Sequence, residues 1–342
     1  MNANPDISEQ ELDEKLKFFT ERFVQLKSEI AKAVVGHEQL VTDTLVAIFS
    51  RGHVLLEGVP GLGKTHLVKV LSSALGLTFG RVQCTPDLMP ADILGTHIIG
   101  EDASGRRAMR FEKGPVFRHL LLVDEINRAT PKTQSALLEV MQEHTVTAGG
   151  EKFQMPEPFF VLATQKPREM EGTNPLPEAQ LDRFFFKLNV TFPELDELVN
   201  ISKQTTGIAP PSLNEVMDGD QMLQMQTLLN HVPAADPITR YAASLVLATH
   251  GQVSGDQADD LKRYIAYGSS PRGLQALIRA ARVYCLLDGR TAVAVQDVQR
   301  AARPALRHRM ILNFEGQAES VDVDALIDRL LSAVPTPGAV AA

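Results

Sequence analysis

Short apolar runs alternate with stretches of helical periodicity between residues 34 and 190. The apolar runs that predict buried strands cover residues 54–57, 77–84, 120–124, 159–164 and 184–190. Residues 64–75 predict a helix that stops at Gly76, since glycine suits the left-handed position that ends many helices. Strands that alternate with helices usually form a parallel sheet covered on both faces, so this region is predicted to be an α/β core.

The segments on either side of this core have helical periodicity. Near the start of the chain, apolar residues at spacings of four and three predict a stripe along a helix of about six turns. They are Leu12, Leu16, Phe19, Phe23, Leu26 and Ile30. A coiled-coil seam is the alternative, but packing on its own domain is favoured because no regular charge pattern flanks the stripe. The later helical segments cover residues 222–231, 237–250, 272–288, 295–309 and 322–334.

Glycines and prolines interrupt the periodicity between the core and the later helices, which indicates a linker. The predicted domains are an N-terminal amphipathic helix (1–33), the α/β core (34–205), the linker (206–221), an all-helical domain (222–335) and a flexible tail (336–342).

The composition is that of a folded protein. Of the 342 residues, 44% are hydrophobic and 22% are charged, which is enough for a full core and excludes disorder as the main state. The 34 basic residues are outnumbered by 42 acidic ones, and the net charge is −8. Such a surface is poorly suited to the phosphate backbone of nucleic acid, although a local basic groove stays open as an alternative.

The start of the chain lacks the basic-then-apolar layout of a signal peptide. The longest apolar runs, such as residues 120–123, fall far short of the ~20 residues of a membrane span. We therefore expect a cytoplasmic protein with no membrane span. Cys84 and Cys285 have no Cys or His neighbours at metal-ligand spacing, so two reduced thiols are expected rather than a zinc site.

A glycine-rich motif, GVPGLGKT, covers residues 58–65 and matches the phosphate-binding pattern GxxxxGK[ST]. Its glycines let the backbone wrap so that N–H groups point at phosphate oxygens, and the start of the next helix adds to that field. Lys64 is expected to reach the β- and γ-phosphates and Thr65 to ligate Mg²⁺. The nucleotide-binding residues predicted here are Gly58, Val59, Pro60, Gly61, Leu62, Gly63, Lys64, Thr65 and His66.

Two acids, Asp124 and Glu125, follow the apolar strand at residues 120–124. Ligands of parallel sheets bind at the carboxyl ends of the strands, so Asp124 is predicted to hold Mg²⁺ and Glu125 to polarise the attacking water. The sequence lacks an NKxD guanine-reading motif, which disfavours a GTPase. The paired acids favour hydrolysis by water over transfer to a small molecule, which disfavours a kinase.

Four ordered motifs together resemble those of the MoxR family of AAA+ ATPases, and the resemblance runs from about residue 34 to residue 309. They are GVPGLGKT (58–65), LLLVDEINRA (120–129), EGTNPLPEAQLDRF (171–184) and SPRG (270–273). The resemblance implies a P-loop NTPase fold, with an αβα parallel-sheet core followed by a helical lid, and implies ATP with Mg²⁺. It also places Val35, Gly36 and His37 beside the adenine.

The resemblance assigns roles to two arginines. Arg183, in LDRF, occupies the arginine-finger position, from which a neighbouring subunit stabilises the charge that develops on the γ-phosphate. A salt bridge that caps the next strand is the alternative reading. Arg272, in SPRG, matches sensor 2; an arginine in the first turn of a helix opposes the macrodipole, which suits a residue aimed at bound phosphate.

Lys166 departs from the family pattern, which usually carries Asn there to position the attacking water. A charged lysine cannot accept a hydrogen bond. Either Thr164 or Gln165 substitutes for the asparagine, or turnover is slow.

Two insertions, residues 87–114 and a hairpin predicted at 145–155, match the family, in which such loops face the ring pore or a partner. Arg300, Arg303 and Arg307 share one face of a predicted helix. A nucleic-acid stripe is possible there, but a solvated face or pairing with the next subunit is favoured because no aromatic residues interleave the row.

The leading hypothesis is a MgATP-driven remodelling ATPase, or chaperone, that forms a homo-oligomer, expected to be a hexamer because Arg183 needs a neighbour's γ-phosphate. The resemblance implies maturation or assembly of client proteins or metal-cofactor enzymes, usually with a von Willebrand factor A domain partner. Two alternatives stay open. One is a DNA-dependent motor, which the acidity disfavours, and the other is an ATP-binding scaffold with little hydrolysis, which only Lys166 supports.

Overall fold

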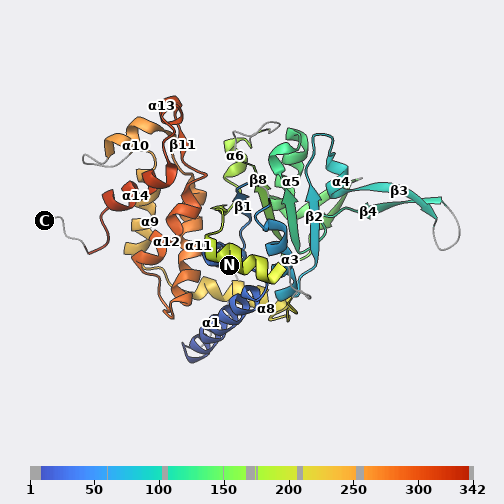
Figure 1. The fold of residues 1–342 in the computed structure, drawn as a ribbon, viewed down its shortest axis with the longest axis horizontal. Coiled ribbons are helices and arrows are strands. Elements are labelled where there is room, and N and C mark those ends of the chain that lie inside the picture. Colours follow the sequence, from blue (N-terminus) through green and yellow to red (C-terminus); the bar gives the residue numbers. More distant parts are fainter. Residues whose placement is uncertain are drawn as a thin grey trace. The chain divides into compact units, whose positions relative to one another are not determined.

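A computed structural model describes the chain as two compact units, residues 30–220 and residues 1–29 together with 221–342 (Figure 1). We call the first the α/β unit and the second the helical unit. The described residues are 9–59, 61–101, 107–148, 150–166, 174, 176–205, 211–251 and 258–338. The predicted linker and tail lie partly outside them, and their boundaries stay predictions.

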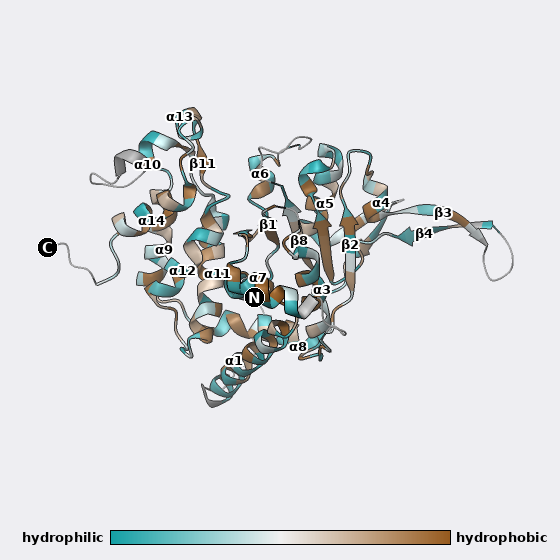
Figure 2. Ribbon diagram, viewed as in Figure 1, coloured by the Kyte–Doolittle hydropathy of each residue, from teal (hydrophilic) through white to brown (hydrophobic). Residues whose placement is uncertain are grey.

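The α/β unit is built on a sheet of five parallel strands in the order β2-β5-β8-β1-β9. Its strands are β1 (Val54–Glu57), β2 (Phe79–Gln83), β5 (Leu120–Asp124), β8 (Phe160–Gln165) and β9 (Phe186–Asn189). All five lie within two residues of the predicted strands. Every residue of β5 and β8 is buried, as the continuous apolar runs require. Much of the sheet is coloured as hydrophobic in Figure 2.

The strand order decides what meets at the carboxyl edge of this sheet. β8 pairs with β1 on one side and with β5 on the other. The glycine-rich loop follows β1, and the two acids come at the end of β5. Because parallel strands end at the same edge, the last residues of β8 must lie between the loop and the acids.

Helices flank the sheet. Those of the α/β unit are α2 (Glu38–Phe49), α3 (Lys64–Ala74), α4 (Pro90–Leu94), the short 3₁₀ helix η1 (Ile126–Arg128), α5 (Pro131–Glu143), α6 (Glu178–Leu181) and α7 (Leu195–Thr205). The start of α5 is fixed locally, because the Thr130 hydroxyl accepts the N–H of Thr133 and Pro131 fills the first helical position. The helix ends at His144, which has the left-handed conformation.

Two hairpins extend the α/β unit beyond the sheet. They are β3 (Gly95–Glu101) with β4 (Arg107–Lys113), and β6 (Thr145–Ala148) with β7 (Glu151–Gln154), which confirms the hairpin predicted at 145–155. Phe111 of β4 stacks on Phe153 of β7 with ring centroids 4.4 Å apart, so the hairpins pack on each other at their bases. Farther out, β3 and β4 project away from the sheet (Figure 1). There Ile99 and Met109 face each other in register and are 72% and 71% exposed.

The helical unit contains each of the helices predicted for it. Its elements are α1 (Glu9–Ala31), α8 (Gly219–Leu228), η2 (Leu229–His231), α9 (Asp236–Ala248), α10 (Ala258–Tyr264), α11 (Pro271–Leu287), α12 (Val295–Leu306), α13 (Phe314–Ala318) and α14 (Val323–Ala333). It also carries a short antiparallel pair, β10 (Ile265–Tyr267) with β11 (Ile311–Leu312), which is too short to leave a periodic signal in the sequence.

The stripe on α1 packs within the chain and is not a coiled-coil seam. Leu16, Phe19, Phe23 and Leu26 are all buried. The Thr20 hydroxyl on the same helix donates a 3.1 Å hydrogen bond to the carbonyl of Leu286 in α11. Packing of α1 against other helices of the helical unit therefore accounts for the apolar stripe. Over the described part of the chain, none of the helices is both long and apolar enough to cross a bilayer.

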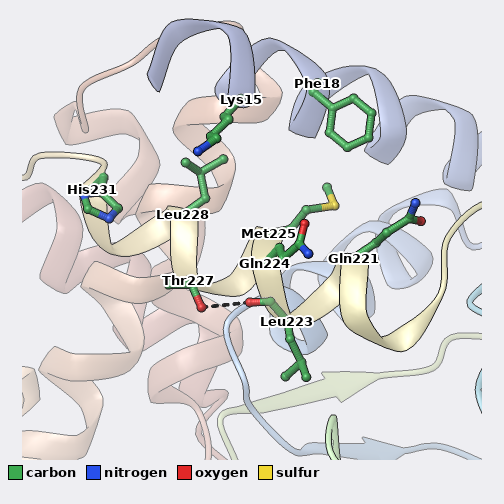
Figure 3. A pocket seen from close by; sticks show the side chains of 9 residues that line it. All are labelled: Lys15, Phe18, Gln221, Leu223, Gln224, Met225, Thr227, Leu228 and His231. Atoms are coloured by element: carbon green, nitrogen blue, oxygen red, sulfur yellow. Dashed lines mark hydrogen bonds between the residues drawn. The ribbon is translucent and has the colours of Figure 1, made fainter. Parts of the chain in front are cut away.

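A groove of about 440 Å³ lies between α1 and α8 (Figure 3). Phe18, Met225 and Leu228 give it a largely apolar lining, with Lys15 and His231 at its rim. The glycine-rich motif that the sequence singles out for phosphate is not among its lining residues. The candidate phosphate site therefore lies in the α/β unit.

The burial of both cysteines predicts slow thiol chemistry. Cys84 and Cys285 are free and buried. Burial, reinforced by nearby carboxylates, raises the pKa of Cys84 to about 12 and the pKa of Cys285 to about 11. At pH 8 at most about one thiol in a thousand is then ionised, so the native protein should barely react with Ellman's reagent over minutes. Two equivalents should react in guanidinium chloride, whereas a rapid reaction of the native protein would contradict this burial.

Candidate functional site

The loop after β1 has the backbone shape that phosphate binding needs. Gly61 and Gly63 have φ of 88° and 73°, and no described atom crowds a Cβ at either, so the left-handed backbone alone requires glycine. Gly58 is constrained by space, because a Cβ there would lie 2.6 Å from the carbonyl oxygen of Val190. Lys64 opens α3, and its Nζ donates to the carbonyl of Gly58 at 2.5 Å. Pro60 lies outside the described residues.

This loop, the two acids and the end of β8 line one cleft of about 390 Å³. Its lining residues are Gly58, Gly61, Leu62, Gly63, Lys64, Thr65, His66, Arg81, Gln83, Asp124, Glu125, Thr164, Gln165 and Lys166. The structure thus brings together most of the residues that the sequence singled out for phosphate and metal. Val59 is exposed and lies outside this lining.

Asp124 is held by two neighbouring strands. Its Oδ2 pairs with Nε of Arg81 on β2 at 2.7 Å, and the Thr164 hydroxyl on β8 lies 3.4 Å from its Oδ1. A second Arg81 nitrogen, Nη2, donates to Gln83 at 3.1 Å. Sequence reasoning missed Arg81, because its significance depends on β2 being the neighbour of β5. The only feature of the sequence that pointed to Arg81 was its charge, at an exposed position of a strand with alternating burial.

Both carboxylate oxygens of Glu125 are paired with cations. Oε2 lies 3.0 Å from Nη1 of Arg128, and Oε1 lies 3.1 Å from Nζ of Lys166. Burial raises the pKa of Glu125, but the hydrogen bonds and charges of Arg128 and Lys166 outweigh it and leave that pKa below its usual value. The backbone of Glu125 is also fixed: it has φ of 55°, and its N–H donates to the Thr164 hydroxyl at 2.8 Å.

The end of β8 is held from both sides. The buried side chain of Asn127, after the acids, donates to the carbonyl of Lys166 at 3.1 Å and accepts its N–H at 3.3 Å. On the other side, the Gln165 amide nitrogen donates to Glu57 at the end of β1. Glu57 in turn pairs with Lys187 of β9 at 2.9 Å. Asn127, Glu57 and Lys187 escaped sequence reasoning, since these contacts join distant segments.

Lys64 lies in a partly desolvated position. Burial lowers the pKa of its ammonium, and the nearby carboxylates of Asp124, Glu57 and Glu125 only partly offset that effect. A bound anion would stabilise the charged form. Binding of an anion beside Lys64 is therefore electrostatically favourable.

The cleft also fits Mg²⁺. Thr65 and Asp124 supply a hydroxyl and a carboxylate oxygen, the hard ligands that this ion prefers. Among the described residues, His, Cys, Asp and Glu side chains form no group of three that could hold a metal ion. Mg²⁺ does not require one, because it usually takes one or two protein ligands and completes its shell with water and substrate phosphates.

The remaining sequence-predicted residues lie outside this cleft. Gly36 and His37 have φ of 71° and 56° at the start of α2, and a Cβ on Gly36 would overlap Glu197 of α7. Arg183, after α6, lines a separate hollow of about 320 Å³ beside Glu139 and Glu143 of α5.

Arg272 belongs to the helical unit, in the first turn of α11. Its backbone N–H donates to the Ser270 hydroxyl at 3.1 Å, which is the local cap that the sequence predicts. The roles assigned to Arg183 and Arg272 by resemblance remain predictions.

The row of arginines on α12 and at its C-cap, Arg307, has partners within the chain. Arg303 makes two hydrogen bonds to Asp328 of α14, at 2.8 and 2.6 Å, and Arg307 makes two to Asp324, at 3.0 and 2.7 Å. Arg300 lies over the ring of Tyr284, 4.3 Å from its centroid. The row is therefore not a free basic stripe, because α14 supplies carboxylates to two of its arginines, while Arg303 stays 54% exposed to solvent.

Comparisons with known proteins agree with this architecture. Residues 53–186 match the family described as "ATPase family associated with various cellular activities (AAA)", and residues 257–330 match "AAA lid domain". The chain is 43% identical over 309 residues to Chaperone MoxR1 of Mycobacterium tuberculosis, covering 90% of this chain and 81% of that protein. It is 33% identical over 353 residues to Protein MoxR of Paracoccus denitrificans, covering 96% and 100%.

A solved structure has the same fold. The crystal structure of a protein from Cytophaga hutchinsonii is 35% identical and matches with a TM-score of 0.88, covering 95% of this chain and 97% of that one. These findings agree with the four sequence motifs: the fold is shared, the lid model matches, and the sequence identity extends over most of the length of the named relatives. The chain belongs to the MoxR family of AAA+ ATPases.

Proposed function

We propose that the protein hydrolyses MgATP and uses the energy to remodel client proteins. The observation that carries this proposal is the single cleft in which the glycine-rich loop, Lys64, Asp124 and Glu125 come together. Membership of a family that includes a chaperone and is described as ATPases supports the same proposal. We place the work in the cytoplasm, where ATP is made and where free thiols such as Cys84 stay reduced.

The residues that would contact MgATP and the attacking water have defined tasks in this proposal. The amides of the loop and Nζ of Lys64 bind the phosphate oxygens, while Thr65 and Asp124 would hold Mg²⁺. When bound there, Mg²⁺ would supply positive charge that offsets the negative charge of the phosphate groups. Glu125 accepts a proton from the attacking water, and its position is set by Thr164 through the backbone N–H.

We propose that subunits assemble as a ring, with six as the expected number. Arg183 lines a hollow separate from its own phosphate cleft, which suits a residue that acts on a neighbour. The resemblance to family members adds a von Willebrand factor A domain partner and client maturation. The exposed pair Ile99 and Met109, on the projecting β3–β4 hairpin, is our candidate for contact with a client.

The two alternatives are less well supported. A DNA motor conflicts with the net charge of −8 and with the pairing of Arg303 and Arg307 to carboxylates of α14. A scaffold with little hydrolysis is favoured only by the Lys166–Glu125 ion pair. A comparison of ATP hydrolysis by the parent protein and by Glu125→Gln separates the scaffold from the motor.

Glu125→Gln should lower the rate of ATP hydrolysis by about 100-fold or more, because the amide cannot take the proton from water. ATP binding should stay within about threefold of the parent value, since the loop and Lys64 are intact. Phosphate release and calorimetry measure the two quantities, with Lys64→Ala as the variant that loses binding. Equal background rates in the parent protein and Glu125→Gln would favour the scaffold.

Arg183→Ala should also abolish hydrolysis while preserving ATP binding, because the arginine acts in a neighbour's cleft. A 1:1 mixture of Arg183→Ala and Glu125→Gln subunits should recover activity, up to about a quarter of the parent rate for random assembly. Each active cleft then combines Glu125 of one subunit with Arg183 of the next. If the mixture stays as inactive as its components, Arg183 does not act between subunits.

Lys166→Asn should raise the hydrolysis rate at least about twofold. The change releases Oε1 of Glu125 from an ion pair and supplies an uncharged group that can accept a hydrogen bond. Lys132→Asn, at an exposed position at the start of α5, makes the same charge change away from the cleft and serves as the control. An unchanged or lower rate for Lys166→Asn would count against a restraining role for the lysine.

A further inference from the structure

The last two residues of β8 and the residue that follows them make different contacts at the edge of the cleft. The Thr164 hydroxyl is engaged twice, since it accepts the N–H of Glu125 and lies beside Asp124. The Lys166 ammonium is engaged by Glu125 and has no acceptor to offer. Gln165 lies between them, lines the cleft, and is 8% exposed.

The orientation of the Gln165 carboxamide is fixed by its neighbour. Gln165 and Glu57 stand directly opposite each other in the parallel pairing of β8 with β1. The Glu57 carboxylate, paired with Lys187 at 2.9 Å, can only accept a hydrogen bond, so the amide nitrogen of Gln165 must face it. The carbonyl oxygen is therefore the polar atom of this cleft-lining side chain that the hydrogen bond to Glu57 does not use.

We propose that this carbonyl oxygen, Oε1 of Gln165, is the acceptor that positions the water attacking the γ-phosphate. The proposal rests on the function proposed above and adds one catalytic residue to it. Gln165 would perform the task that the family's asparagine performs one residue later. Glu57 and Lys187 are positioning residues, because they act only by holding the amide.

The reaction balances with these groups alone. The water oxygen forms a bond to the γ-phosphorus, and the bond from that phosphorus to the β–γ bridging oxygen breaks, so that oxygen leaves with ADP. One proton of the water passes to Glu125 and later returns to solvent. The other proton is held by Oε1 of Gln165 during the attack and stays on the inorganic phosphate. Two acceptors orient one water along the line of displacement.

Gln165→Met is the decisive variant, because methionine matches the length of glutamine and removes both polar groups of the side chain. The turnover number should fall about 10- to 100-fold, with KM for ATP changed less than about twofold. Binding supplies a readout without turnover. Affinity for MgADP should stay unchanged, while affinity for MgADP with aluminium fluoride, which mimics the in-line geometry, should fall about tenfold.

Introducing Gln165→Met into the Lys166→Asn protein separates a catalytic role of Gln165 from a structural one. In the Lys166→Asn protein, the introduced asparagine supplies an acceptor at the family's usual position, so adding Gln165→Met should cost less than about threefold. A loss as large as in the parent background would assign Gln165 a structural role and overturn the proposal. Thermal melting confirms that each variant is folded, and Gln165→Ala serves if Gln165→Met does not fold.

The failures of the two proposals are distinguishable. If the parent protein hydrolyses ATP and Gln165→Met changes neither the turnover number nor the affinity for the aluminium fluoride complex, the role of Gln165 is wrong and the ATPase stands. If the parent hydrolyses no faster than Glu125→Gln, the ATPase is wrong and the role of Gln165 falls with it.

Discussion

The parallel pairing of β8 between β1 and β5 is the constraint on which the candidate site depends. The loop after β1 and the acids after β5 are not on adjacent strands, so their spacing is set by the strand between them. Thr164 makes this coupling specific, because its hydroxyl accepts the Glu125 N–H and lies beside the Asp124 carboxylate. A shift of β8 by one residue would replace this hydroxyl by a side chain facing the opposite side of the sheet.

The second constraint is electrostatic. Three carboxylates and several cations lie at one edge of the sheet, and each carboxylate has a cationic partner within the chain. The pairs are Asp124 with Arg81, Glu125 with Arg128 and Lys166, and Glu57 with Lys187. These contacts give each carboxylate a defined partner within the chain. Preorganised charge of this kind is the main source of catalysis in phosphoryl transfer.

Other parts of the α/β unit suit contacts beyond the chain itself. Arg183 lies in a hollow with Glu139 and Glu143, separate from the phosphate cleft, and the β3–β4 hairpin carries Ile99 and Met109 in contact with solvent. The base of that hairpin is anchored by the stacking of Phe111 on Phe153. These features are the ones on which the proposed assembly and the proposed contact with a client rest.

The sequence by itself determined the features that depend on neighbouring residues. The apolar runs predicted five strands within two residues, the stripe on α1 predicted a packed helix, and the spacing of glycines with Lys64 predicted the phosphate loop. Only the tertiary structure decided which distant residues meet: Arg81 with Asp124, Glu57 with Gln165, Lys166 with Glu125, and the α12 arginines with α14. Strand order and helix packing set these contacts, and neither is encoded in local periodicity, because each depends on how segments far apart in the sequence share one core.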